Sequence, residues 1–354
     1  MSFDPDASAL TALDELIANA KRTKTAMVPM VGGASTRRYF RVTFDDAATA
    51  VAMFVPEGNK AEEIQKDRLS TEFRRWPFLE IGDLLRDHDV LVPRILAEDT
   101  LRGWLLLEDL GDDTLANYLL RRPETKSALY TCAVTDLARA QNRLAELPPS
   151  SVVRTRAFDE DLLRWEIDHF REWGLEARGH FLKPEQRTTF DALAQRLAKR
   201  IASLPYGFTH RDYQSRNLMV RETDAGPRLV WIDFQDALLG PRVYDLVALL
   251  NDSYQEFDRA FVEARLGEFA DAAGMNATER ASLVFQFDLV TVQRKLKDAG
   301  RFVFIERVKG NSSFLKFVTP TIAKVKGSLA RLAPADEDMR LLAALLHEVI
   351  PDEA

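Results

Sequence analysis

The hydrophobic pattern of the chain changes its period near residue 111, and no other feature restricts the possible folds as strongly. Before this point, residues 26–56 and 90–111 hold runs of β-branched and aromatic residues separated by turn signals, which is the pattern of β-strands. After it, apolar residues recur mostly at helical spacing. A sheet followed by helices is typical of an α+β fold.

We expect an N-terminal lobe of residues 1–108 and a C-terminal lobe of residues 109–354. The first lobe should form an antiparallel sheet with a leading helix at 6–22 and a second helix in the region 60–88. In the second lobe only two short strands, in "NLMV" and "LVWIDF", interrupt the helices. The helical patterns of that lobe cover residues 112–122, 124–147, 158–177, 184–203, 241–272, 276–300 and 312–348.

Composition excludes several classes of protein. The 354 residues suffice for one large or two ordinary domains, and a hydrophobic share of 46% is ordinary for a globular chain. The formal net charge of -7 argues against non-specific binding to nucleic acid. The first residues are acidic where a signal peptide would need basic ones, and no run reaches the roughly 18 apolar residues of a transmembrane helix. We therefore expect a cytoplasmic monomer that binds neither nucleic acid nor membrane.

The stretch "HRDYQSRN", residues 210–217, contains side chains that phosphoryl transfer requires. That reaction needs a carboxylate directed at the attacking hydroxyl and oxygen ligands for Mg²⁺. Asp212 can accept the hydroxyl proton, Asn217 offers an amide oxygen to a hard cation, and His210 can brace the loop. Alone, the motif is equally consistent with a polar turn that satisfies its own backbone.

A second motif, "RLVWIDFQDA", places Asp233 at the end of an apolar strand. A carboxylate in such a place is costly to bury unless a metal or hydrogen-bond donors accompany it. If the two short strands form a hairpin, Asn217 and Asp233 come to one Mg²⁺ ion. The two motifs together are much more specific than either alone, and they favour a metal site over a polar turn.

Two stretches of the N-terminal lobe are candidates for nucleotide binding. The glycine turn in "VGGASTRRYFRV" lets backbone N–H groups approach phosphates, although it is also consistent with a simple hairpin turn. The strand exit "LLLEDLG" can offer backbone groups to an adenine ring, or can be an ordinary strand end. The residues expected to bind the nucleotide are Gly32, Gly33, Ala34, Ser35, Thr36, Arg37, Arg38, Glu108, Asp109 and Leu110.

In this order, the motifs resemble those of the aminoglycoside phosphotransferase-like kinases, which share the two-lobed protein-kinase fold. The resemblance covers residues 26–330 and is closer still to bacterial anomeric sugar kinases that act on N-acetylmuramate and N-acetylglucosamine in peptidoglycan recycling. It implies a kinase that uses ATP and Mg²⁺ to phosphorylate a small sugar. The stretches that carry it are "GGASTRRYFRV", "VPRILAED", "LLLEDLG", "HRDYQSRNLM", "IDFQDALLGPRVYDLVALL" and "QRKLK".

Residue by residue, the resemblance implies that Asp212 is the catalytic base and that Asn217 and Asp233 bind the metal. It assigns residues 32–38 to the phosphates, residues 108–110 to the adenine, and Asp245 to holding the catalytic loop. The sugar would lie near Asp212, where an arginine or lysine would suit an acidic acceptor, although each such cation is also consistent with a solvated surface residue. By position, the candidates for this pocket are Arg216, Gln235, Asp236, Arg242 and the segment Gln293, Arg294, Lys295 and Lys297.

The chain departs from the wider kinase pattern in one respect. The strand "TAVAMFVP" carries no lysine for the nucleotide phosphates, and Met53 or a neighbour takes its place. Arg37, Arg38 or Lys60 must then compensate. The acids of the following region that would pair with such a lysine, and that lack an obvious partner, are Glu62, Glu63 and Glu72.

Two alternatives remain open from the sequence. The acceptor of the same reaction can be an aminoglycoside, a choline-like alcohol or another sugar, although the arginines and lysines around the candidate pocket suit a polycationic acceptor poorly. The chain can also be a nucleotide-binding pseudokinase, against which the intact set of Asp212, Asn217 and Asp233 counts. A protein kinase is excluded because residues 234–244 are too few for a peptide-binding activation segment.

Overall fold

The computed structural model describes residues 5–30, 37–56 and 75–350. The chain divides into two compact units, one made of Met1–Asn117 with Leu218–Gln235 and the other of Tyr118–Asn217 with Asp236–Ala354. The first unit therefore extends beyond the expected boundary at residues 108 and 109. It also includes a β-hairpin that we expected in the helical lobe.

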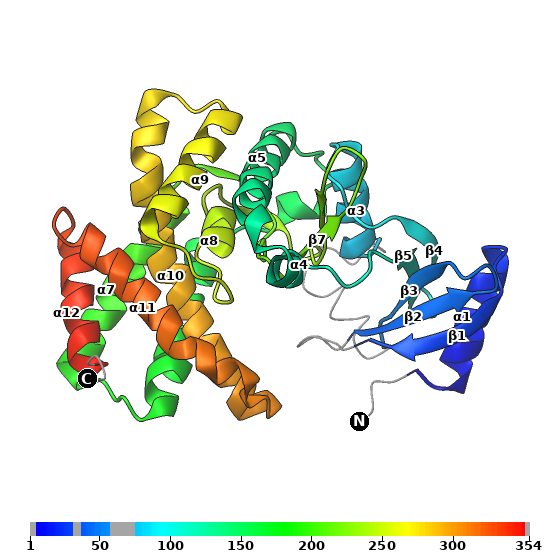
Figure 1. Ribbon diagram of the computed structural model, residues 1–354. Coiled ribbons are helices and arrows are strands. Elements are labelled where there is room, and N and C mark those ends of the chain that lie inside the picture. The colour runs from blue at the N-terminus through cyan, green and yellow to red at the C-terminus, as the bar shows by residue number, and fades with distance from the viewer. Residues whose placement is uncertain (1–4, 31–36, 57–74, 351–354) are drawn as a thin grey trace. The chain divides into compact units, whose positions relative to one another are not determined.

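A five-stranded antiparallel sheet forms the first unit (Figure 1). Helix α1 (Ala7–Asn19) begins at Asp6, whose carboxylate accepts a hydrogen bond from the backbone N–H of Ala9 at 2.8 Å. The helix buries its apolar residues, Leu13 among them, in the same core cluster as the strands. The strand order across the sheet is β1 (Lys24–Pro29), β2 (Arg38–Phe44), β3 (Thr49–Phe54), β5 (Trp104–Glu108) and β4 (Ile95–Asp99).

The β-hairpin of the first unit consists of β7 (Leu218–Arg221) and β8 (Arg228–Trp231), and its pairing confirms the prediction of two adjacent short strands. The residue Phe234, just beyond the hairpin, stacks on Phe78 of α3 (Pro77–Asp87) with 4.9 Å between ring centroids. The helix α3 is the end of the region 60–88 that we expected to be helical; residues 57–74 lie outside the described residues. The packing of α3 against Phe234 thus supports the backbone next to Asp233.

The second unit is mostly helical and contains one two-stranded pair, β6 (Tyr206–Thr209) with β9 (Leu238–Pro241). Its first helix, α4, crosses the division between the units. The α-helices are α4 (Leu115–Arg121), α5 (Lys126–Arg143), α6 (Glu160–His169), α7 (Pro184–Ala202), α8 (Tyr244–Leu250), α9 (Arg259–Ala273), α10 (Ala277–Lys309), α11 (Val318–Leu332) and α12 (Glu337–Val349). The short helices are η1 (Pro123–Thr125), η2 (Val152–Thr155), η3 (Phe170–Leu175), η4 (Glu176–Arg178) and η5 (Ser312–Phe317).

The helix predictions were wrong in three places. The segments 241–272 and 312–348 are each divided into separate helices, because Asp258 and Asp336 cap new helices at α9 and α12. Helix α10 runs beyond the expected end at residue 300 and stops at Gly310, which has a left-handed backbone with φ of 68°. The strands β6 and β9 were not predicted, since each has only four residues.

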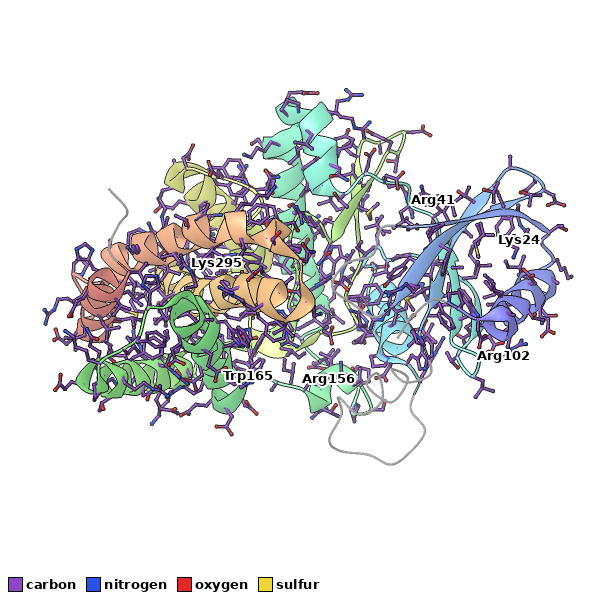
Figure 2. The ribbon with its side chains drawn as sticks, turned by 90° about the horizontal axis from the view of Figure 1, so that it is seen from below. Lys24, Arg41, Arg102, Arg156, Trp165 and Lys295 are labelled. Carbon is purple, nitrogen blue, oxygen red and sulfur yellow. The ribbon has the colours of Figure 1, made fainter. Side chains whose placement is uncertain are left out.

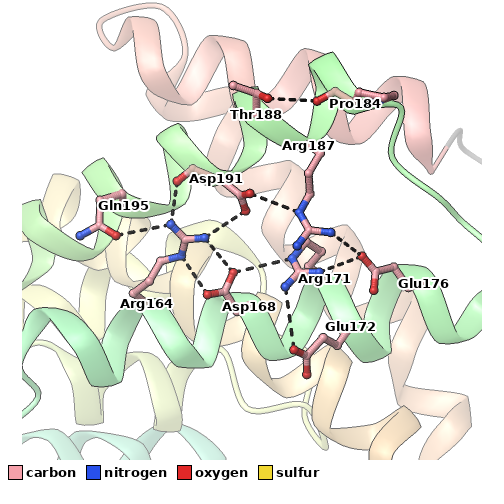
Figure 3. A network of polar contacts seen from close by, with 10 residues as sticks. All are labelled: Arg164, Asp168, Arg171, Glu172, Glu176, Pro184, Arg187, Thr188, Asp191 and Gln195. Atoms are coloured by element: carbon pink, nitrogen blue, oxygen red, sulfur yellow. Dashed lines mark hydrogen bonds and ion pairs between the residues drawn. The ribbon is translucent and has the colours of Figure 1, made fainter.

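A network of ion pairs connects α6, η3, η4 and α7 (Figure 3). Arg164 on α6 donates to Asp168 at 2.9 Å and to Asp191 on α7 at 3.0 Å. Arg171 donates to Glu176 at 2.8 Å. The network surrounds η3, which is a π-helix, a rare form that needs such support.

Helix α10 packs unusually close to the junction of α6 and η3. A Cβ atom at Gly300 would lie 2.8 Å from the carbonyl oxygen of His169 and 2.8 Å from Cα of Phe170. Only glycine permits this backbone contact. The close approach places α10 beside α6, and both helices contribute charged side chains to the candidate site. In the part of the chain that the structure describes, no helix is both long and apolar enough to cross a membrane.

Candidate active site

The loop 210–217 connects β6 to β7, and Asp245 on α8 holds its beginning. The carboxylate of Asp245 is fully buried and accepts backbone N–H groups from His210 at 2.6 Å and Arg211 at 3.0 Å. Burial raises the pKa of Asp245 to about 7, although these two donors act in the opposite direction. The expectation that Asp245 holds the loop is confirmed.

The end of the loop is held by a second buried acid, Asp252, which we did not predict. One carboxylate oxygen of Asp252 accepts both the backbone N–H of Ser215 at 3.0 Å and its hydroxyl. Within the loop, the N–H of Gln214 donates to the carbonyl of Asp212 at 2.9 Å. The available signal was the place of Asp252 shortly after a mostly apolar helix, where a buried acid must find donors.

Asp212 lies in this loop with 39% of its side-chain surface exposed. Its Oδ1 atom is 3.4 Å from Nη2 of Arg294 on α10. Burial works against the charged form, but neighbouring cations, above all Lys297 and Arg294, hold the pKa of Asp212 below its ordinary value. The carboxylate is therefore ionised at neutral pH, as a general base must be before it accepts a proton.

His210 is fully buried, and its ring meets the ring of Tyr213 edge-on with 5.7 Å between centroids. Burial of the ring fits a supporting role for His210 better than contact with a substrate. The Arg211 side chain next to it reaches Glu166 on α6, with 3.6 Å between Nη2 and Oε1. Glu166 is fully buried, and we did not predict its role from the sequence. The available signal was its position, because an acid on the apolar face of a predicted helix must be buried with a partner.

Asn217 and Asp233 have the chemistry of magnesium ligands. The side-chain nitrogen of Asn217 donates to the carbonyl of Asp212 at 2.9 Å, which fixes the rotation of the amide and with it the direction of Oδ1. Asp233 follows β8 with an exposed carboxylate and a left-handed φ of 63°, and Oδ1 accepts from Gln235 at 2.9 Å. A carboxylate and an amide oxygen fit Mg²⁺, which usually takes its other ligands from phosphates and water. Across the described ranges, no group of three or more His, Cys, Asp or Glu side chains could hold a metal ion.

The expected nucleotide residues are only partly described. Arg37 is buried, with 7% of its surface exposed. Nη1 of Arg38 donates to the main-chain carbonyl of Arg37 at 3.2 Å. Met53 on β3, which we expected, itself or through a neighbour, to take the place of the absent lysine, is fully buried. The residues of these predictions that lie outside the described residues are Gly32, Gly33, Ala34, Ser35, Thr36, Lys60, Glu62, Glu63 and Glu72.

At the strand exit, both acidic side chains are engaged within the first unit. Asp109 accepts from Nε of Arg41 at 2.7 Å and from the N–H of Gly111 at 2.9 Å (Figure 2 labels Arg41). Burial opposes its charge, but the hydrogen bonds from Arg41, Gly111 and Thr49 together lower the pKa of Asp109. Glu108 pairs with Arg221 at 2.9 Å. Recognition of a base at residues 108–110 would therefore rely on the main chain.

The candidates for the acceptor pocket have different environments. The guanidinium of Arg216, an exposed residue, lies 3.5 Å from the ring centroid of Tyr254. Arg242 is bound to Asn142 at 2.8 Å. Lys295 is 1% exposed and donates to Asp298 at 2.9 Å, inside the helical unit (Figure 2). Gln235 is bonded to Asp233 and Asp236 is partly buried. Sugar contact remains a prediction for all five, with Lys295 and Arg242 already engaged by protein partners.

Comparisons with known proteins show the family of the chain. Residues 27–281 match the model of the phosphotransferase enzyme family, APH. The chain is 32% identical to an N-acetylmuramate/N-acetylglucosamine kinase of Neisseria meningitidis serogroup B, over 90% of this chain and 89% of that protein. It is 34% identical to a protein of the same name from Pseudomonas putida, over 76% of this chain and 77% of that one.

Solved structures show the same fold. The ADP-bound aminoglycoside phosphotransferase APH(2'')-Ib has a TM-score of 0.58 at 13% identity, over 90% of this chain and 98% of that chain. The Plasmodium vivax ethanolamine kinase has a TM-score of 0.56 at 14% identity, over 85% of this chain and 82% of that chain. The fold is thus kinase-like, an antiparallel sheet followed by a mostly helical part, as predicted. The chain belongs to the phosphotransferase enzyme family, and it is an ATP-using kinase that acts on a hydroxyl group of a small molecule.

Proposed function

We propose that the chain phosphorylates the anomeric hydroxyl of an N-acetylated amino sugar, N-acetylglucosamine or N-acetylmuramate, for peptidoglycan recycling. The names of the relatives support these acceptors, since the likeness covers most of the chain. The structural observation that carries the proposal is the ionised Asp212 in a loop held by buried acids. A use of ATP supports a cytoplasmic enzyme, and we propose that it acts as a monomer.

In this mechanism the oxygen of the sugar hydroxyl attacks the γ-phosphorus of ATP while Asp212 accepts the hydroxyl proton. The bond between the γ-phosphorus and the β–γ bridging oxygen breaks, and ADP leaves. The anomeric hydroxyl is the most acidic hydroxyl of a sugar because the ring oxygen withdraws electron density from C1. A weak base such as an aspartate therefore suffices to orient it and to take the proton late in the transfer. The loop bonds from Asp245 and Asp252 keep Asp212 in place during this step.

Mg²⁺ held by Asn217 and Asp233 would neutralise charge on the β- and γ-phosphates. The register of the hairpin supports this pair of ligands: Leu218, which comes directly after Asn217, pairs with Trp231, two residues before Asp233. Residues 32–38 would surround the phosphates, and the main chain of residues 108–110 would receive the adenine. Of the proposed acceptor residues, Arg216 is an exposed cation that could bind an acidic group of the sugar.

The decisive experiment compares free reducing sugars with their 1-O-methyl glycosides, with ADP formation as the readout. We expect turnover of N-acetylglucosamine and N-acetylmuramate and none of the blocked glycosides, because the methyl group removes the reacting hydroxyl. Equal turnover of both forms would disprove anomeric transfer. An aminoglycoside and a choline-like alcohol serve as alternative acceptors, and Mg²⁺-dependent turnover of any acceptor would exclude a pseudokinase.

A further inference from the structure

Arg294 contacts two consecutive residues of the catalytic loop from inside the helical unit. It lies on α10 and is 2% exposed. One terminal nitrogen, Nη1, donates to the carbonyl of Arg211 at 2.8 Å, and the other, Nη2, lies 3.4 Å from Oδ1 of Asp212. A single side chain thus links the main chain before the base with the carboxylate of the base.

The two contacts require the shape of arginine. The guanidinium is a rigid planar fork that can direct two donors to two acceptors, whereas a lysine has one nitrogen. Burial of this charge is costly unless partners compensate for the lost water. The ring of Tyr244, whose centroid is 4.7 Å from the guanidinium carbon, supplies one such partner through a cation–π contact.

A second path connects α10 to the same loop. Gln293, which precedes Arg294, donates from Nε2 to Glu166 at 2.8 Å, and Glu166 faces the guanidinium of Arg211. Asp245 holds the N–H of Arg211 from the opposite side. Arg211 has a left-handed φ of 79°, a conformation that is unfavourable for a residue other than glycine and that persists only where its surroundings impose it. Arg294 is part of those surroundings.

Four segments of the chain contribute the charged and titratable groups around Asp212. Lys297 is the cation that lowers the pKa of Asp212 most, although its Nζ lies 3.2 Å from Asp298, which offsets part of its charge. Arg294 makes the direct contact with the carboxylate. The titratable and charged groups that act on Asp212 are His210 and Arg211 of the loop, Asp245 of α8, Tyr254 after α8, and Arg294, Lys297 and Arg301 of α10.

We propose that Arg294 is a positioning residue for phosphoryl transfer: its two contacts with the catalytic loop set the direction of the Asp212 carboxylate, without touching the substrate. The inference rests on the proposed role of Asp212 as the base. It distinguishes Arg294 from the surface cations of the candidate pocket, which would act on the sugar itself.

The first test is the pH profile of kcat in the full-length Arg294→Met and Arg294→Lys variants. In Arg294→Met we expect kcat to fall by about 100-fold and its acid limb to move to higher pH by about one unit, because the carboxylate loses its neighbouring charge. In Arg294→Lys the charge remains, so we expect the acid limb to stay near that of the wild type while kcat falls about tenfold. The KM for ATP should be unchanged in both variants.

Arg331→Met is the matched control. Arg331 donates to Asp288 of α10, the helix that carries Arg294, at 2.8 Å and is not part of the catalytic loop. Its loss should lower the melting temperature and leave the pH profile unchanged, as a purely structural role predicts. If the acid limb of Arg294→Met coincides with that of the wild type, or if Arg294→Lys keeps full kcat, the positioning role is wrong.

A second measurement needs no substrate. The carboxyl of Asp212 can be titrated by ¹³C NMR in protein with ¹³C-labelled aspartate, and the spectrum of Asp212→Asn assigns the signal. We expect a higher pKa of Asp212 in Arg294→Met than in the wild type, and a pKa near that of the wild type in Arg294→Lys, which keeps the charge. A raised pKa without any sugar turnover would disprove the proposed function and retain the role of Arg294. Sugar turnover with an unchanged pKa of Asp212 would support the proposed function and disprove the role of Arg294.

Discussion

The side-chain nitrogen of Asn217 donates a 2.9 Å hydrogen bond to the main-chain carbonyl of Asp212. The proposed metal ligand is thereby tied to the proposed base, and the bond closes a loop of six residues, 212–217, in which each end fixes the other. The two residues should therefore not be separable in function. A change at Asn217 should affect both the metal requirement and the chemical step.

Asn217→Ala should lower kcat by about 100-fold and raise the Mg²⁺ concentration needed for half-maximal rate, because it removes both an oxygen ligand and the bond to Asp212. The measurement is kcat as a function of Mg²⁺ concentration. As a control, Asn276→Ala removes the N-cap of α10, where Asn276 accepts from Thr278 at 3.0 Å. That change should lower stability and leave the Mg²⁺ dependence as it is; an unchanged Mg²⁺ requirement in Asn217→Ala would contradict the metal assignment.

Asp212→Asn should lower kcat by about 1000-fold, because an amide cannot accept the hydroxyl proton. The KM of the sugar and the affinity for ATP, measured by calorimetry, should change little. Near-full turnover in this variant would show that another group serves as the base.

The buried imidazole of His169 should make stability depend on pH. Burial and the nearby cations Arg301 and Lys297 lower its pKa from 6.5 to about 4. Between these two values the unfolded chain binds a proton that the folded protein does not, so the free energy of unfolding falls as the pH falls from 6.5 towards 4. The full effect of such a shift is about 3 kcal/mol.

His169→Phe should remove this contribution, since phenylalanine retains the ring contacts with Trp165 and Phe304 and does not titrate. The comparison is denaturant unfolding at several pH values between 4 and 7. Trp165→Phe alters the same aromatic cluster and leaves the imidazole in place, so it should keep the pH dependence. Identical pH dependence in His169→Phe and the wild type would mean that the pKa of His169 is the same in the folded and unfolded protein.

Gly300→Ala should destabilise the helical unit by about 1–3 kcal/mol, because the added methyl group meets backbone atoms of His169 and Phe170 that cannot rotate away. Gly267→Ala on α9 is the opposite case: no atom lies within 4 Å of the added carbon, and alanine should stabilise that helix by about 1 kcal/mol. The melting temperatures of the two variants should therefore shift in opposite directions. A neutral Gly300→Ala would mean that α10 can move away from α6 at little cost.

Local features of the site were predictable from the sequence, and distant ones were not. The hairpin β7–β8 and the order of the motifs follow from short-range alternation and from residue types at close spacing. Arg294 and Asp212 are 82 positions apart, and Asp252 and Ser215 are 37 apart. No periodicity connects such pairs, so Arg294 was placed only in the general neighbourhood of the site, and Asp252 and Glu166 were missed.

Helix boundaries failed for a related reason. An apolar repeat continues across a break when the flanking helices bury the same kind of face, so the pattern of 241–272 predicts one helix although Asp258 starts a new one. For the nucleotide side, residues 32–36 of the expected phosphate loop 32–38 lie outside the described residues, and the role of the loop stays a prediction. The departure at Met53 is plain from the sequence, and the structure adds that the residue is buried in the sheet.

Insertions and deletions should be poorly tolerated within the π-helical segment η3. A π-turn holds one residue more than an α-helical turn, and each residue added to a helix rotates the next side chain by about 100° around the axis. Removal of a single residue between Phe170 and Leu175 would convert the segment towards a regular helix and turn Glu176 away from Arg171. Insertions and deletions here should be tolerated far less well than at the exposed turn around Gly226, so libraries that vary chain length would be depleted at η3 even where single substitutions survive.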